Sequence, residues 1–188
     1  MLRHRTKALL ATAAAGLVTT GLVSEAPADA ASYVGRVDAH HGLVAHYVPT
    51  AAAPRYGHYA NGARIRLVCK VRSVSIGQND RWYLARGSAR RWVSARYVHN
   101  IGAAPRWCGD SHRSRGRVTA AVLNRREAPT LRAAKVGTLH RHDRVSIVCW
   151  VDGLGEGAGD TQWYQLGNGT WVSADHIGPT KRRVELCA

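Results

Sequence analysis

A repeated spacing of cysteine and aromatic residues constrains this chain more than any other feature of its sequence. In the later copy, Cys149 precedes a Trp-Tyr pair by 14 residues, a second tryptophan by 22 and a closing cysteine by 38. In the earlier copy, Cys69 precedes the same three features by 13, 23 and 39 residues. This agreement indicates a tandem repeat of two small domains. The matching residues are Trp82, Tyr83, Trp92 and Cys108 in the first copy and Trp163, Tyr164, Trp171 and Cys187 in the second.

Short segments with apolar residues at alternate positions indicate that both copies consist of β-strands. Residues 62–71 and 143–151 alternate apolar residues with Arg, Lys or Ser, as expected of antiparallel strands with one buried face. The Asn168-Gly169 pair lies between aromatic and β-branched runs and predicts a tight hairpin. A single helical turn is expected at residues 95–98 and again at 174–177. The predicted fold class is therefore all-β, with two small β-barrels in tandem.

The four cysteines are expected to form one disulfide in each copy. Four cysteines allow three pairings, and the repeat selects Cys69 with Cys108 and Cys149 with Cys187. Closing loops of this length stabilises a domain by about 4 kcal/mol in the chain-entropy view. A metal site is the alternative, but the chain has no Cys-x-x-Cys and no matching pair of histidines.

The first 30 residues have the features of a cleaved signal peptide. A basic start is followed by an uncharged apolar run and by the small-residue sequence Ala28-Asp29-Ala30. A permanent membrane anchor is the alternative, although the apolar run is short. We expect the protein to be secreted and to be extracellular or associated with the cell wall, with no membrane span after cleavage. The predicted organisation is a signal peptide at 1–30, a first domain at 31–108, a flexible polar linker at 109–115 with modest contact between the domains, and a second domain at 116–188.

The charge of the chain is strongly one-sided. The sequence has 27 basic residues (Lys and Arg) and 12 acidic residues (Asp and Glu). Residues 1–30 contain three of the basic and two of the acidic residues, so the rest of the chain has 24 basic and 10 acidic residues. Outside the cell, such a charge favours anionic polymers such as teichoic acids, acidic polysaccharides or extracellular DNA. A role in solubility alone is an equally simple reading of the composition.

The order of these features resembles the bacterial Src-homology-3-like (SH3b) family, in the form that exported actinobacterial proteins carry with one cysteine pair per domain. Such modules are small β-barrels that bind peptidoglycan or its peptides. The resemblance therefore implies two SH3-like barrels and a wall ligand. The first copy departs from the pattern, since it lacks the Leu-Asn-Arg sequence. The matching motifs of the second copy are Leu123-Asn124-Arg125, Pro129-Thr130, Val136-Gly137-Thr138-Leu139, Asp143-Arg144-Val145, Trp163-Tyr164 and Gly169-Thr170-Trp171-Val172.

No arrangement of residues in the sequence predicts an enzyme. The chain has no Gly-x-Ser-x-Gly, and the cysteines are expected to be paired, so no nucleophile is available for a Cys-His hydrolase. No cofactor and no metal site are predicted. One open question is a group of histidines in the first copy that could bind a metal or lie on the surface, namely His40, His41, His46 and His58.

Aromatic and arginine side chains are the candidates for ligand binding. Neighbouring residues on a strand point to opposite faces, so one member of each Trp-Tyr pair packs inside and the other can meet a ligand. The resemblance and this alternation together lead to a non-catalytic, exported binding protein for peptidoglycan or anionic wall polymer. The alternative is a module that binds and regulates another exported protein, and nucleic acid is the weakest candidate partner. The predicted ligand-binding residues are Trp82, Tyr83, Trp92, Arg125, Arg126, Trp163, Tyr164 and Trp171.

Overall fold

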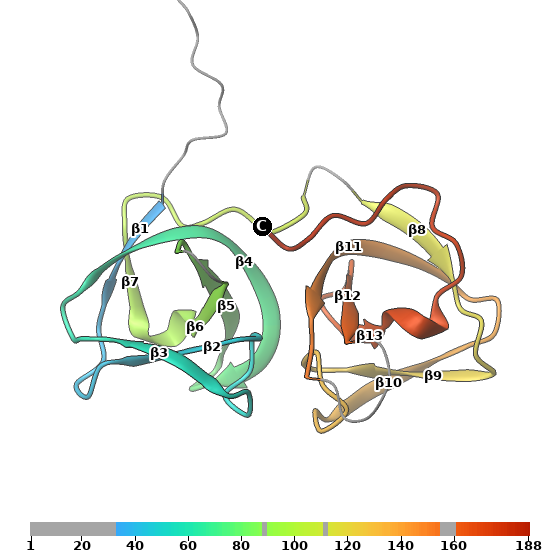
Figure 1. The fold of residues 1–188 in the computed structure, drawn as a ribbon, viewed down its shortest axis with the longest axis horizontal. Coiled ribbons are helices and arrows are strands. Elements are labelled where there is room, and N and C mark those ends of the chain that lie inside the picture. The colour runs from blue at the N-terminus through green and yellow to red at the C-terminus, as the bar shows by residue number, and fades with distance from the viewer. Residues whose placement is uncertain (1–32, 88–89, 111–112, 155–160) are drawn as a thin grey trace, which may run out of the picture. The chain divides into compact units, whose positions relative to one another are not determined.

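The computed structural model describes residues 33–87, 90–110, 113–154 and 161–188. The predicted signal peptide and part of the predicted linker lie outside the described residues. The described chain forms two antiparallel sheets and two short 3-10 helices, so the predicted all-β class with two small domains is confirmed. The curled sheets are shown in Figure 1.

The first sheet has seven strands in the order β3-β2-β6-β5-β4-β1-β7. The long strand β4 alternates buried apolar residues with exposed arginines, which is why one of its faces can close a core. The 3-10 helix η2, at the expected helical turn, is capped by the Ser94 side chain. The elements are β1 (Tyr33–Val37), β2 (Leu43–His46), β3 (Arg55–Tyr59), β4 (Arg64–Ile76), β5 (Asn79–Ala85), β6 (Arg91–Ser94), η2 (Ala95–Tyr97) and β7 (Val98–Ile101).

The second sheet has six strands in the order β10-β9-β13-β12-β11-β8, which repeats the order of the first six strands of the first sheet, while β7 has no counterpart in it. The register agrees as well, because Gly35 opposes Ile65 in the first domain where Gly116 opposes Val145 in the second. The expected hairpin at Asn168-Gly169 joins β12 and β13. The elements are β8 (Ser114–Arg117), β9 (Val122–Arg126), β10 (Lys135–His140), β11 (Arg144–Asp152), β12 (Gln162–Leu166), β13 (Trp171–Ser173) and η3 (Ala174–His176).

Both predicted disulfides are present. Cys69 is joined to Cys108, and Cys149 to Cys187, over sequence separations of 39 and 38 residues. In each domain the closing cysteine lies on a segment that hydrogen-bonds to the long central strand. Disulfides of this kind form and persist in an oxidising environment. Among the residues that the structure describes, no helix is long and apolar enough to span a bilayer.

Each domain has its own apolar core, and a third cluster is shared between them. Tyr83 packs into the core of the first domain, and Tyr164 packs against that of the second. The tryptophans beside them, Trp82 and Trp163, belong to the shared cluster, so each pair does point to opposite faces. The buried members of the shared cluster are Cys69, Val71, Trp82, Leu84, Trp92, Cys108, Val148, Cys149, Val151, Trp163, Trp171 and Cys187.

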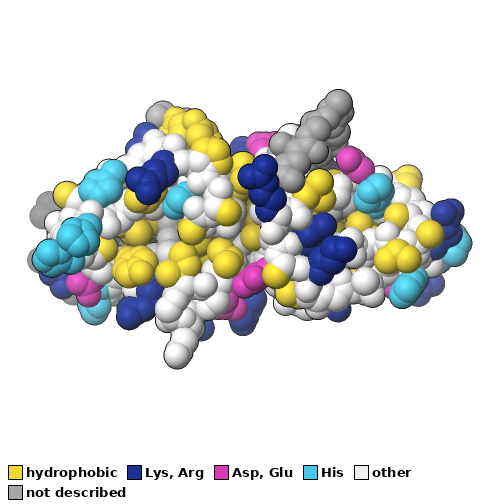
Figure 2. All heavy atoms as spheres, turned by 90° about the horizontal axis from the view of Figure 1, so that it is seen from below, with side chains coloured by type: hydrophobic (Ala, Val, Ile, Leu, Met, Phe, Trp, Pro, Cys, Tyr) yellow, Lys and Arg dark blue, Asp and Glu magenta, His cyan; other side chains and the backbone are white. Residues whose placement is uncertain are grey.

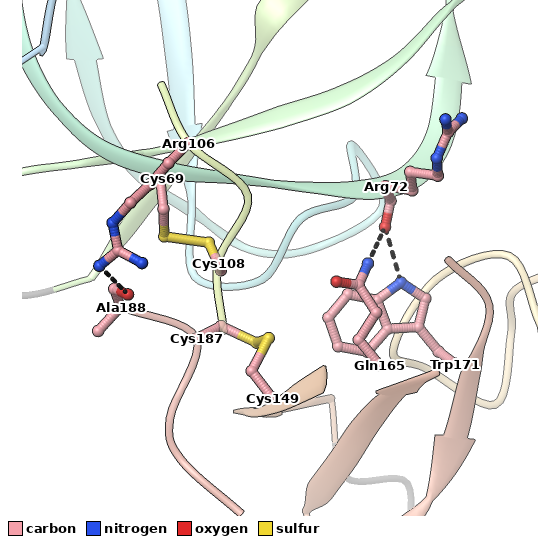
Figure 3. The surroundings of a disulfide bond; sticks show 9 residues. All are labelled: Cys69, Arg72, Arg106, Cys108, Cys149, Gln165, Trp171, Cys187 and Ala188. Carbon is pink, nitrogen blue, oxygen red and sulfur yellow. Dashed lines mark hydrogen bonds between the residues drawn. A yellow bond between two sulfur atoms is a disulfide. The ribbon is translucent and has the colours of Figure 1, made fainter. Parts of the chain in front are cut away.

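The two domains make more contact than the sequence predicts. Residues 32–188 form one compact unit, and the domains are joined by hydrogen bonds as well as by the shared cluster. Figure 3 shows the two disulfides near one another and the side chains of Gln165 and Trp171 directed at the Arg72 carbonyl. Each domain covers the same face of the other, because the residues that contribute are equivalent in the repeat.

Candidate functional site

The second tryptophan of each repeat is completely buried. Trp92 and Trp171 both have a relative exposure of 0%. Trp171 donates from Nε1 to the backbone oxygen of Arg72 at 2.9 Å, so its polar atom is also satisfied within the protein. Both rings pack in the cluster shared by the domains, and Trp92 also lines a cavity of about 770 Å³ to which both domains contribute. The prediction that these two tryptophans contact a ligand stays a prediction.

The Trp-Tyr pairs have little exposed surface either. Trp82, Tyr83 and Trp163 have relative exposures of 1%, 4% and 4%, and Tyr164 is half-buried. Trp82 donates from Nε1 to the Val74 carbonyl at 2.9 Å. These rings fill cores because the chain has no Phe, and large apolar volume has to come from Trp and Tyr.

The two predicted arginines, Arg125 and Arg126, are half-buried and lie on β9, opposite residues of β10. Arg126 donates from Nη1 to the Ala133 carbonyl at 2.8 Å. In the first domain, His46 occupies the equivalent position, because Arg126 and His46 oppose Trp171 and Trp92 respectively. His46 likewise contacts the carbonyl seven residues later, with 2.9 Å between its Nδ1 and the Ala53 oxygen. Arg126 thus anchors a loop, while Arg125 lies across the strand from Gly137.

A groove of about 390 Å³ lies in the first domain, between the turn after β1, the end of β4 and helix η2. A volume of this size suits a small ligand or a short peptide segment. The sequence singled out its histidines but gave no sign of the apolar walls that accompany them. The lining includes Ala39, His40, His41, Leu43, His46, Ile76, Trp82, Ser94 and Tyr97.

A hydrogen bond fixes the orientation of the buried histidine in this groove. His46 is 8% exposed and packs edge-on against Trp82, with 5.9 Å between the ring centroids. Its Nδ1 faces the Ala53 carbonyl oxygen, which can only accept, so Nδ1 donates this hydrogen bond. His58 is held in the same manner, by a 3.0 Å contact between Nε2 and the His41 carbonyl.

Tyr97 is the most accessible aromatic side chain of the groove, with 37% relative exposure. It ends helix η2, and the guanidinium of Arg96 lies 5.9 Å from its ring centroid. The groove thus combines aromatic surface, an imidazole and a nearby cation. Such a set can bind an apolar or hydrogen-bonding group. The described residues contain no group of three or more His, Cys, Asp or Glu that could hold a metal ion.

The surface outside the groove is rich in cations. Figure 2 shows Lys and Arg side chains over both domains, and histidines toward both ends of the molecule. The ion pairs found among the described residues join Arg72 to Asp80 and Arg90 to Asp152, and all four side chains are partly exposed. Exposed pairs of this kind contribute little stability. Because they involve two of the 27 Lys and Arg residues, much of the positive charge is available to a partner.

Comparison with known proteins gives no family for this chain. No family model matches it, and no curated protein matches it. A solved structure of NlpC2 from Trichomonas vaginalis aligns with a TM-score of 0.30 and 12% sequence identity. The alignment covers 79% of this chain and 48% of that structure, so the chain spans about half the length of that protein.

Proposed function

We propose that this is an exported, non-catalytic binding protein that attaches to peptidoglycan or to associated anionic polymers of the cell wall. The SH3b resemblance of the sequence supports a wall ligand. The single observation that carries the proposal in the structure is the first-domain groove, where Tyr97, Ile76 and His46 line a hollow of about 390 Å³. The cationic surface would add salt-sensitive attachment.

The groove can recognise a wall peptide or a sugar by two kinds of contact. The Tyr97 ring and the Ile76 side chain offer apolar surface, and the imidazole of His46 offers a polar nitrogen. Contacts of this type are short-ranged and resist salt, whereas attraction to the arginine-rich surface weakens as salt increases. The two contributions can therefore be separated by a salt series.

The test is co-sedimentation of the mature protein with sacculi from which anionic polymers have been removed. Tyr97→Ala should lower retention at high salt, because it removes the exposed ring of the groove. Tyr47→Ala is the matched control, since Tyr47 is an exposed tyrosine of the same domain that does not line the groove. Equal retention of the two variants would contradict the groove as the binding site. Absence of pelleting at any salt would instead favour a protein partner.

A further inference from the structure

We propose that the second domain carries a binding site for a phosphate-rich polymer without bases, in a cationic cleft beside β8 and β11. This inference rests on the proposed function, because it names the anionic wall component and the place that binds it. The cleft has a volume of about 590 Å³. Four of the lining side chains are cations and none is an acid. The lining residues are Arg115, Gly116, Arg117, Arg144, Val145, Ser146, Pro179 and Lys181.

The walls of the cleft are fixed by backbone contacts. The C-terminal segment runs along β8, where Gly178 N–H donates to the Arg117 carbonyl at 2.8 Å and Lys181 N–H donates to the Arg115 carbonyl at 3.1 Å. The buried hydroxyl of Ser114 donates to the Arg182 carbonyl at 2.8 Å. The four cations are therefore held on two neighbouring strands and on a segment pinned to them.

The arrangement of these cations includes like-charge repulsion, although Arg117 donates from Nη1 to the His142 carbonyl at 3.1 Å. Arg117 and Arg144 are direct cross-strand partners in the antiparallel pair β8–β11. Like charges placed directly opposite each other destabilise a sheet. Arg115 lies two residues from Arg117, on the same face of β8, which adds a third positive charge. An anion between these side chains would replace repulsion with charge-assisted hydrogen bonds.

The chemistry of the cleft favours phosphate over other anionic partners. Guanidinium groups bind phosphate oxygens through two parallel hydrogen bonds, and a tetrahedral phosphate presents its oxygens to donors that come from more than one strand. None of the lining residues is aromatic, so the cleft offers no ring on which a nucleic-acid base could stack. These features indicate a polymer of phosphate groups that lacks bases.

The first domain provides an internal comparison. Arg36 opposes Arg64 on β1 and β4, at the register position that Arg117 and Arg144 occupy in the second domain. Two positions further along, on the same face of the sheet, Val34 opposes Arg66 where Arg115 opposes Ser146. Each domain thus carries three arginines at these positions, whereas the fourth cation of the cleft, Lys181, belongs to the second domain. On the corresponding side of the first domain, β7 pairs with β1.

The experiment measures binding of the mature protein to linear inorganic polyphosphate across a salt series. Arg117→Gln/Arg144→Gln removes two charges from the cleft, and Arg36→Gln/Arg64→Gln removes two charges from the same register in the first domain. We expect the cleft variant to bind polyphosphate at least about tenfold more weakly than the native chain. The slope of log K against the logarithm of the salt concentration should become shallower by about two. The control variant should change affinity by less than about threefold. Without polyphosphate, the cleft variant should change stability to denaturant by less than about 1 kcal/mol, because the loss of repulsion between the two arginines offsets the loss of the Arg117 hydrogen bond to the His142 carbonyl.

Three results would overturn the proposal. Equal weakening by the two variant pairs would show that only net charge matters. Tighter binding of polygalacturonate or of duplex DNA than of polyphosphate would show that the cleft selects another class of polymer. Absence of polyphosphate binding would remove the site altogether. The same variants applied to sacculi without anionic polymer separate this inference from the proposed function, because retention there depends on the first-domain groove.

Discussion

The indole of Trp171 donates a 2.9 Å hydrogen bond to the backbone carbonyl of Arg72, which lies 99 positions earlier in the chain. The same oxygen accepts a second 2.9 Å bond from the side-chain amide of Gln165. Both donors come from the second domain and the acceptor comes from the first, as Figure 3 shows. This shared oxygen identifies the tryptophan face of the repeat as an interface between domains.

Replacing Trp171 should therefore reduce stability. Trp171→Phe removes one hydrogen bond and part of a buried ring, and it should lower the free energy of unfolding by about 1–3 kcal/mol. Trp171→Ala should cost about 3–5 kcal/mol. Denaturant unfolding with the disulfides intact measures both effects.

Trp107→Phe is the control for that experiment. Trp107 is half-buried and lies beside the cations of Lys70 and Arg72, outside the buried clusters. Its replacement should cost less than Trp171→Phe. If Trp171→Phe kept full stability but lost wall binding, the ligand role that the sequence predicts for Trp171 would be supported.

Gln165 tests whether the shared oxygen needs both donors. The equivalent residue of the first domain is Leu84, since Gln165 opposes Cys149 where Leu84 opposes Cys69. Gln165→Leu should change stability by less than about 1 kcal/mol, because the Arg72 carbonyl keeps its bond from Trp171 and an apolar side chain replaces a buried amide. Gln165→Glu should destabilise the protein by several times as much, since it buries a carboxylate facing a carbonyl. Equal effects of the two changes on the unfolding midpoint would contradict this account.

Local patterns predicted most of each domain. The alternation around Cys69 and Cys149, the Asn168-Gly169 turn and the helical turns depend on neighbouring residues, and the repeat itself selected the disulfide pairing. The sequence did not reveal what covers the outward tryptophans. An aromatic residue on the outer face of a strand has the same alternation whether a ligand or another domain packs against it. That distinction depends on contacts between residues more than ninety positions apart, which no local pattern records.

The groove was missed for a related reason. Its histidines are close in the sequence and were recognised as a group, but Ile76 and Tyr97 reach it from distant elements. The first domain differs from the second at β2, where His46 stands at the position of Arg126. That same difference places an imidazole, instead of a loop-anchoring arginine, beside Trp82.

Gly109 tests how closely the two domains pack. It has a φ of +67°, and an added Cβ would lie closer to the backbone oxygen of Val148 than real Cβ atoms approach. Because that contact is with backbone, it cannot be relieved by moving a side chain. Gly109→Ala should therefore lower the free energy of unfolding by more than the strain of a left-handed alanine alone, which is about 1 kcal/mol.

Gly102→Ala is the matched control for that substitution. Gly102 has a φ of +82°, and an added Cβ would meet nothing within 4 Å. This variant should show the backbone strain alone, so the difference between the two unfolding free energies measures the cost of separating residue 109 from β11. Identical losses would indicate that the domains do not pack through Gly109 in solution.

The last prediction concerns alkaline pH. Burial, with a further contribution from the charge of Arg81, lowers the pKa of Lys70 below its ordinary 10.5, while Asp110 acts in the opposite direction. Below pH 10.5 there is thus a range in which the unfolded chain holds a proton on Lys70 that the folded protein has released. Stability rises with pH wherever the unfolded state binds more protons, so the Lys70 contribution should increase the free energy of unfolding as pH approaches 10.5. Lys70→Gln should lack that part of the slope, and Lys70→Arg, which stays charged, should lack it too. Unfolding midpoints of the three proteins, measured side by side from neutral to alkaline pH, check this expectation, and parallel curves for all three would show that Lys70 does not titrate differently in the two states.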